Sequence, residues 1–122
     1  MKDEETTIQK LKEMVTHFRD ERDWGKFNDP KSVAQALSIE ASELLEVFLW
    51  KEKDQITESL KNEPDFRDEL SDEIADVFIY LLQIANDSGI ELSKALEAKM
   101  EKNALKYPVE KSRGKATKYT KL

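Results

Sequence analysis

One stretch of this sequence is apolar or aromatic at almost every position, and it limits the folds open to the chain. From Ile74 to Ala85 the only exceptions are Asp76 and Gln83. A helix that is apolar on all sides is normally buried. A fold that buries this stretch also takes the carboxylate of Asp76 into an apolar environment, where an unpaired charge is very costly.

The rest of the chain predicts further helices separated by polar breaks. Charged residues make up 38% of the chain and there are only three glycines and three prolines, a composition that favours helices. Apolar side chains recur at spacings of three and four residues, and proline or glycine lies at the breaks. We expect helices over residues 4–22, 30–51, 64–86 and 92–106, with a polar connection over 51–64, either with or without a short helical turn. The predicted fold class is all-α, a four- to five-helix bundle that forms a single domain over residues 1–122.

The composition also excludes several classes of protein. A net charge of −6 argues against general DNA or RNA binding, which needs a basic surface. The chain has no cysteine, so it has no disulfides. No apolar run approaches the length of a membrane span, and the first residues do not resemble a signal peptide. We therefore expect a cytoplasmic protein.

The charge is unevenly distributed along the chain. Residues 111–122 contain five basic side chains and no acidic one, whereas acidic residues concentrate between Glu40 and Asp76. We expect residues 109–122 to form a basic C-terminal tail. Two interpretations of this tail stay open: a solvated segment, or a segment that folds over a polyanionic ligand bound at the acidic centre.

Two of the predicted helices contain a pair of carboxylates at the same spacing. Glu40 and Glu43 are three residues apart in one helix, and Glu73 and Asp76 repeat that spacing in the other. Side chains three apart project from one face of a helix, so the like charges in each pair repel. A divalent cation turns this repulsion into attraction, and oxygen ligands suit Mg²⁺, with Mn²⁺ as a substitute, rather than zinc. We expect all four carboxylates to be metal ligands.

The residues alone leave an alternative to this metal site. Acidic pairs at this spacing are common on solvated helix faces, and the chain would then be a non-catalytic helical binding module. A di-iron bundle is a further class with carboxylate ligands, but it needs Glu-x-x-His motifs. The single histidine, His17, lies outside any such motif, which argues against that class.

Carboxylate-bound magnesium usually serves phosphate groups, and a nucleotide also needs aromatic side chains against its base. The aromatic candidates are Trp24, Phe27, Trp50 and Tyr80. If the two carboxylate helices pack antiparallel, Trp50 and Tyr80 lie toward opposite ends of the cluster. We therefore expect a neighbouring subunit to complete the pocket.

At these same positions the sequence resembles a known family. The patterns Glu40-Ala-Ser-Glu43 and Glu73-Ile-Ala-Asp76 resemble the ExxE and ExxD signature of the MazG-like all-α nucleoside triphosphate pyrophosphohydrolases. The segments similar to the dCTP pyrophosphatase branch of that family are 21–27, 36–50, 68–82 and 106–122.

The resemblance implies a bundle that assembles as a homotetramer and hydrolyses dCTP, or a base-modified relative, to the monophosphate and pyrophosphate. The implied role is the cleansing of the nucleotide pool, with a nucleoside triphosphate and further copies of the chain as partners, and no nucleic acid or membrane. The residues implied to line the nucleoside pocket are Trp24, Gly25, Lys26, Phe27, Asn28, Trp50 and Tyr80. Where the branch has a substrate-contacting histidine on its first helix, this sequence has Val15. That difference leaves dUTP or another nucleoside triphosphate as the alternative substrate.

The expected mechanism joins the carboxylates to the resemblance. Bound Mg²⁺ supplies charge neutralisation at the phosphate oxygens and alignment of a water for in-line attack. Glu40 or Glu43 takes the proton of that water as the general base, and the sequence does not choose between them. The basic residues expected to bind phosphate are Arg113 and Lys115.

Overall fold

The computed structural model describes every residue from Met1 to Leu122, and it contains helices and no strands. The helices are α1 (Ile8–Asp20), α2 (Pro30–Phe48), α3 (Lys53–Asn62), α4 (Pro64–Asp87), α5 (Leu92–Lys106) and α6 (Val109–Ser112). Two short 3-10 helices, η1 (Gly25–Phe27) and η2 (Tyr119–Lys121), lie in the loops. The predicted all-α class is confirmed. The chain packs as two compact units, Met1–Gly89 and Ile90–Leu122, and the single domain expected over residues 1–122 stays a prediction.

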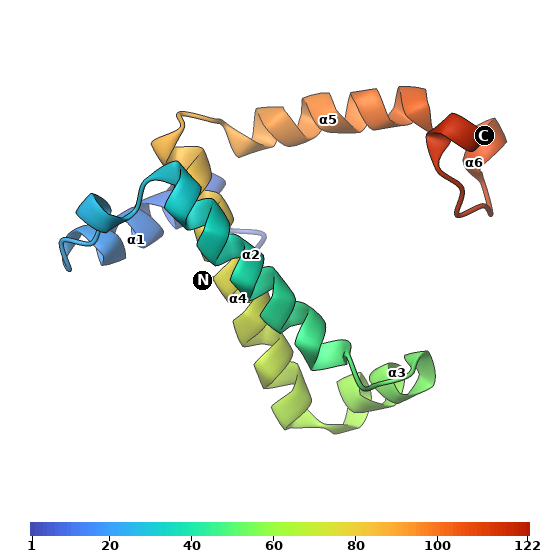
Figure 1. Cartoon of the computed structure of the whole chain (residues 1–122), viewed down its shortest axis with the longest axis horizontal. Coiled ribbons are helices and arrows are strands. Elements are labelled where there is room, and N and C mark those ends of the chain that lie inside the picture. Colours follow the sequence, from blue (N-terminus) through green and yellow to red (C-terminus); the bar gives the residue numbers. More distant parts are fainter. The chain divides into compact units, whose positions relative to one another are not determined.

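The first unit is built on two long antiparallel helices, α2 and α4, which lie side by side (Figure 1). Helix α1 packs against α4 near the carboxyl end of α4, and α3 packs against α4 near its beginning. Arg19 of α1 donates from Nη1 to both carboxylate oxygens of Asp87 at 2.9 Å. The amide of Asn86 also donates to the hydroxyl of Thr16 at 3.1 Å. These contacts hold α1 across one end of the pair.

The start of α2 follows directly from local sequence. The carboxylate of Asp29 accepts from the backbone N–H of Ser32 at 3.0 Å and from its hydroxyl at 2.8 Å. The hydrogen bonds from Ser32, that from its backbone above all, lower the pKa of Asp29 below its usual value. Pro30 occupies the first helical position, where its missing N–H costs nothing. This cap therefore fixes the residue at which α2 begins. The residues that follow, at helical spacing, form the face that packs on α4.

The polar connection predicted over residues 51–64 was wrong, because ten of its residues form α3. Glu52 and Gln55 make a reciprocal capping box, in which the backbone N–H of Glu52 donates to Gln55 Oε1 at 2.7 Å. Ile56 and Leu60 lie four residues apart and are both half-buried. One short apolar stripe and one cap are therefore enough for a helix that packs on a larger neighbour.

The fully buried apolar side chains of the first unit lie near its two ends. Val33 of α2 is 1% exposed, and Leu82 and Ala85 of α4 are 2% and 3% exposed. Toward the other end, Phe66 of α4 meets Phe48 of α2 edge to face, with ring centroids 6.1 Å apart. Between these two apolar ends, the middle of the α2–α4 pair contains the predicted carboxylates.

Helix α4 is less buried in the single chain than its sequence predicts. Ile74, Phe78 and Leu81 are 51%, 38% and 43% exposed, and they follow one another at spacings of four and three residues. They therefore form one apolar stripe on the side of α4 that α2 and α3 leave uncovered. The expectation that α4 is covered on all sides does not hold within one copy of the chain.

The second unit consists of α5, α6 and η2. The rings of Tyr107 and Tyr119 meet edge to face at 5.9 Å, and the ammonium of Lys106 lies 4.8 Å from the centre of the Tyr119 ring. The predicted basic tail therefore contains the short helix α6 and the turn η2. Across the whole chain, none of the helices combines the length and the apolar character needed to cross a bilayer.

Candidate metal and nucleotide site

Three of the four predicted carboxylate ligands meet in the middle of the α2–α4 pair. Glu40 of α2 and Glu73 and Asp76 of α4 each offer a carboxylate oxygen, and these oxygens all lie within 4.8 Å of one another. All three side chains are half-buried. The i, i+3 spacing on α4 and the antiparallel packing of α2 together account for this convergence.

The cluster contains buried oxygen atoms without partners. Oε2 of Glu40 and Oε2 of Glu73 are both buried and accept no hydrogen bond. Seven ion pairs of lysine, arginine and histidine side chains involve carboxylates outside the cluster, among them the pair of Arg19 with Asp87. Buried carboxylate oxygens without a donor are costly and therefore rare in folded proteins. A divalent cation would satisfy both oxygens at once, and the hard oxygen donors fit one.

Burial and mutual repulsion change the acidity of the cluster. Burial is the main cause that raises the pKa of Glu40 to about 6. Hydrogen bonding with Glu43 and then the charges of Glu43, Asp76 and Glu73 raise it further. The pKa of Glu73 is raised as well, mainly by burial and then by the charges of nearby carboxylates. In order of decreasing effect, these are Glu43, Asp76, Glu69 and Asp72. Each shift reflects the cost of adding one more negative charge to a crowded and partly desolvated place. Such a place favours a cation.

Glu43 lies next to the cluster but outside its converging oxygens. Its side chain is exposed, whereas its hydrogen bonding and charge both contribute to the raised pKa of Glu40. One turn of α2 separates the two residues. The roles of Glu43 as a fourth metal ligand and as a general base stay predictions.

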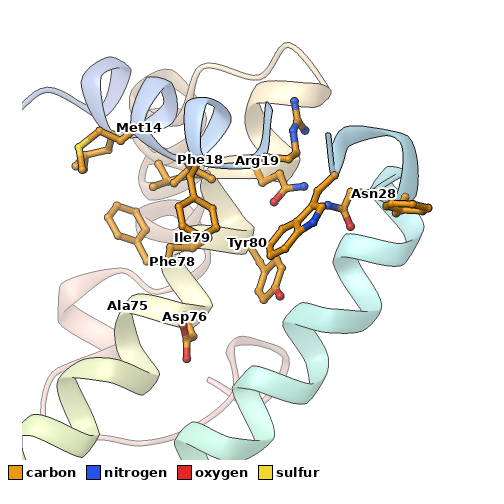
Figure 2. A pocket seen from close by; sticks show the side chains of 15 residues that line it. Met14, Phe18, Arg19, Asn28, Ala75, Asp76, Phe78, Ile79 and Tyr80 are labelled. Carbon is orange, nitrogen blue, oxygen red and sulfur yellow. The ribbon is translucent and has the colours of Figure 1, made fainter. Parts of the chain in front are cut away.

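A pocket of about 690 Å³ opens beside the carboxylates (Figure 2). Most of its lining is apolar and comes from α1, from the loop after α1 and from α4. The lining residues are Leu11, Met14, Val15, Phe18, Arg19, Trp24, Phe27, Asn28, Ala75, Asp76, Phe78, Ile79, Tyr80, Leu82 and Gln83. Asp76 belongs to both the carboxylate cluster and the pocket. A ligand in the pocket would therefore reach the metal site at this residue.

The loop between α1 and α2 places Trp24 against the pocket. Asp23 has a φ of 52°, in the left-handed region that few side chains adopt. The chain reverses there, and the backbone N–H of Trp24 donates back to the carbonyl of Arg19 at 3.1 Å. The Trp24 ring then meets Phe18 edge to face at 5.9 Å, and the guanidinium of Arg22 lies 3.7 Å from the centre of the Phe18 ring. The indole is therefore fixed by its own loop and by α1.

The structure brings four of the predicted nucleoside-binding residues to this pocket: Trp24, Phe27, Asn28 and Tyr80. Gly25 and Lys26 belong to η1, the same turn as Phe27, but do not line the pocket. The ammonium of Lys26 instead pairs with Asp23 at 2.7 Å. Figure 2 shows Asn28 and Tyr80 on the side of the pocket nearer to α2. The binding role of each residue stays a prediction.

Trp50 is a predicted binding residue that does not line this pocket. Trp50 follows the end of α2 and is 87% exposed. Because α2 and α4 are antiparallel, Trp50 and Tyr80 lie toward opposite ends of the carboxylate cluster, as expected. Arg113 and Lys115 belong to the second unit and are both exposed. Their predicted contact with phosphate stays a prediction.

The sequence did not indicate two polar residues of the lining. Arg19 lines the pocket and pairs with Asp87. The hydrogen bond to Asp87 raises the pKa of Arg19, and burial lowers it by a smaller amount. Gln83 lines it as a side chain that is only 6% exposed. The one sequence signal for Gln83 was its position as a polar residue within an apolar run.

The chain is similar to known proteins in both sequence and fold. A sequence model of the MazG-like family matches residues 35–122. The chain is 38% identical to dCTP pyrophosphatase 1 of Rattus norvegicus over 118 residues, which is 97% of this chain and 69% of the rat protein. It is 35% identical to dCTP pyrophosphatase 1 of Homo sapiens over the same shares of both chains. The crystal structure of a pyrophosphatase from Archaeoglobus fulgidus DSM 4304 superposes with a TM-score of 0.75 at 41% identity, covering 83% of this chain and 92% of that one.

Proposed function

We propose that this chain, which belongs to the MazG-like family, converts dCTP and water to dCMP and pyrophosphate with Mg²⁺ as its cofactor. The family and the relatives make it a nucleoside triphosphate pyrophosphatase, and so the non-catalytic binding module is set aside. The cofactor and the base are the parts that we propose. The observation that most supports the cofactor is the pair of buried, unpartnered oxygens on Glu40 and Glu73.

In this proposal Glu40, Glu73 and Asp76 hold the cation, and Glu43 joins them from the next turn of α2. When bound, Mg²⁺ neutralises phosphate oxygens and orients the attacking water. Glu40 or Glu43 accepts one proton of that water while the water oxygen bonds to phosphorus, and the anhydride link between the α- and β-phosphates breaks to give dCMP and pyrophosphate. Carboxylate oxygens and open coordination positions are typical of magnesium sites that act on phosphates.

The pocket would hold the nucleoside. It meets the cluster at Asp76, so a base among the aromatic side chains would extend its phosphates toward the metal. Trp24, Phe27 and Tyr80 supply aromatic surface, and stacking of a base on an aromatic ring stabilises a complex by about 1–3 kcal/mol. The choice of dCTP rests on the substrate named for the relatives. The second candidate is dUTP, because Val15 lines the pocket where the dCTP pyrophosphatase branch has a substrate-contacting histidine.

Three further features belong to the proposal. The assembly would be a homotetramer, supported by the exposed apolar stripe of Ile74, Phe78 and Leu81 on α4. Arg113 and Lys115 would bind phosphate. The enzyme would act in the cytoplasm to remove dCTP or a base-modified relative from the nucleotide pool.

A panel of nucleoside triphosphates with detection of released pyrophosphate tests this function. The wild type with Mg²⁺ should hydrolyse dCTP with the highest kcat/KM, and Glu40→Gln should fold normally while losing most turnover. Hydrolysis of dUTP in preference to dCTP would select the alternative substrate. Normal turnover by Glu40→Gln, or activity that persists in excess chelator, would contradict the metal site.

A further inference from the structure

The side chain of Gln83 has an unusual environment in the pocket. It is 6% exposed, and its amide nitrogen Nε2 is buried without any hydrogen-bond acceptor. Its neighbours along α4 are apolar from Val77 to Ala85 apart from the hydroxyl of Tyr80. A buried amide donor without an acceptor weakens a folded protein, so buried donors nearly always have a partner from the protein, from water or from a ligand.

The position of Gln83 relates it to the metal site. Asp76, Tyr80 and Gln83 follow one another at spacings of four and three residues and all line the pocket. They therefore share one face of α4, with Asp76 at the carboxylate cluster and Gln83 roughly 10 Å further along the helix axis. That distance is comparable to the span from the base of a nucleotide to its phosphates. A nucleotide with its phosphates at Asp76 would place its base near Gln83.

We propose that the carboxamide of Gln83 hydrogen-bonds the edge of the pyrimidine base and thereby determines base selectivity. The inference rests on the proposed function, since it assigns a residue to the base of that substrate. A carboxamide presents an N–H donor and a carbonyl acceptor side by side. Cytosine presents the matching pair, because its N3 accepts and its 4-amino group donates. The same donor and acceptor pattern allows Gln to read adenine in DNA.

This assignment makes the buried nitrogen part of the binding site. With the base bound, Nε2 donates to N3 and Oε1 accepts from the amino group, so the donor is satisfied only in the complex. A site built around a hydrogen bond discriminates strongly against a ligand that lacks the matching group, because its own polar atoms are then left unpaired. Gln83 thus supplies polar recognition in a pocket that otherwise binds through apolar and aromatic contact.

The test compares Gln83→Met with the wild type on two substrates. One is dCTP, and the other is its analogue with a pyrimidin-2-one base, which lacks only the 4-amino group. The wild type should prefer dCTP by about tenfold in kcat/KM, the scale of one or two neutral hydrogen bonds. In Gln83→Met the two substrates should become nearly equal, mainly because KM for dCTP rises while kcat is maintained. Gln35→Met is the matched control, since Gln35 is an exposed residue of α2 outside the pocket.

The outcomes separate the role of Gln83 from the enzyme's activity. If the wild type hydrolyses dCTP and Gln83→Met keeps the same preference between the two substrates, the assignment of Gln83 is wrong and the proposed function stands. If the wild type releases pyrophosphate from no nucleotide, both are wrong. Gln83→Met should unfold at the same temperature as the wild type or higher, because it removes an unsatisfied buried donor. Should this variant fail to fold, Gln83→Asn draws the amide back by one methylene, and the same loss of preference is expected.

Discussion

Glu40 and Glu73 come from different helices, yet each has a buried carboxylate oxygen without a partner, and oxygens of the two side chains lie within 4.8 Å of each other. Two such oxygens in so small a space are a source of repulsion in the metal-free protein and of attraction for a divalent cation. The same geometry therefore has opposite effects on stability and on binding, which makes it easy to test.

Replacing Glu73 by Gln should separate these two effects. The variant removes one charge from the cluster, so the metal-free protein should unfold at a higher temperature than the wild type. Turnover with Mg²⁺ should fall on the order of 100-fold, the scale for losing one group that stabilises charge in a transition state. Thermal unfolding in chelator and steady-state kinetics would measure both. Glu69→Gln, an exposed site one turn earlier on α4, is the control and should change turnover little.

The raised pKa of Glu40 predicts how the stability of the metal-free protein depends on pH. A pKa of about 6 in the folded state lies above the ordinary 4.5, so between these values the folded state binds the proton more readily than the unfolded chain. The contribution of Glu40 to stability is therefore fully present below about pH 4.5 and is lost as the pH rises through about 6. Glu40→Gln cannot ionise, so its advantage in unfolding free energy over the wild type should grow from pH 4.5 to pH 7. Denaturant titrations in chelator would measure this, and an advantage that is constant with pH would contradict it.

The exposed stripe on α4 predicts that further copies of the chain cover it. Leu81→Glu places a charge at one end of this apolar stripe, one turn from Phe78 on the same face. We expect the variant to form a smaller species than the wild type, because burying an unpaired charge in an interface is costly. Light scattering after gel filtration would give both masses. Ser71→Glu, at an exposed polar position of α4, should leave the mass unchanged.

The separation of Trp50 from the pocket predicts a site shared between subunits. Trp50→Ala should lower kcat/KM by about tenfold, in line with the loss of one base-stacking contact. Glu40→Gln should be nearly inactive. If one subunit supplies the carboxylates and its neighbour supplies Trp50, refolding the two variants together should restore activity above the sum of the separate proteins. Activity equal to that sum would contradict a site in which one subunit supplies the carboxylates and its neighbour supplies Trp50.

Local sequence predicted the helices that have clear boundaries. The cap at Asp29 and the prolines at 30 and 64 act on the backbone next to them, so they can be recognised from the sequence alone. Helices α2 and α4 begin at these residues. Helix α3 was missed because its apolar stripe is short and its stability depends on packing against α4. The degree of burial of α4 was also misjudged, since a sequence pattern does not tell whether its own chain or another copy covers a helix.

One part of the candidate site could also be predicted from local sequence, and another part could not. The spacing of the carboxylates within each helix predicted the cluster of Glu40, Glu73 and Asp76, because antiparallel packing of two long helices leaves few other arrangements. The contribution of α1 to the pocket could not be predicted. It depends on where α1 crosses α4, and that crossing is set by pairs such as Arg19 with Asp87, which are far apart in the sequence.

The turn at Asp23 limits which sequences can keep this pocket. Its backbone has a φ of 52°, which glycine adopts freely, aspartate and asparagine tolerate, and β-branched residues strongly resist. Few residue types should therefore be tolerated at this exposed position, although the side chain of Asp23 lines no part of the pocket. Variants that place valine or isoleucine there would be expected to misdirect the neighbouring indole while leaving every lining residue chemically intact.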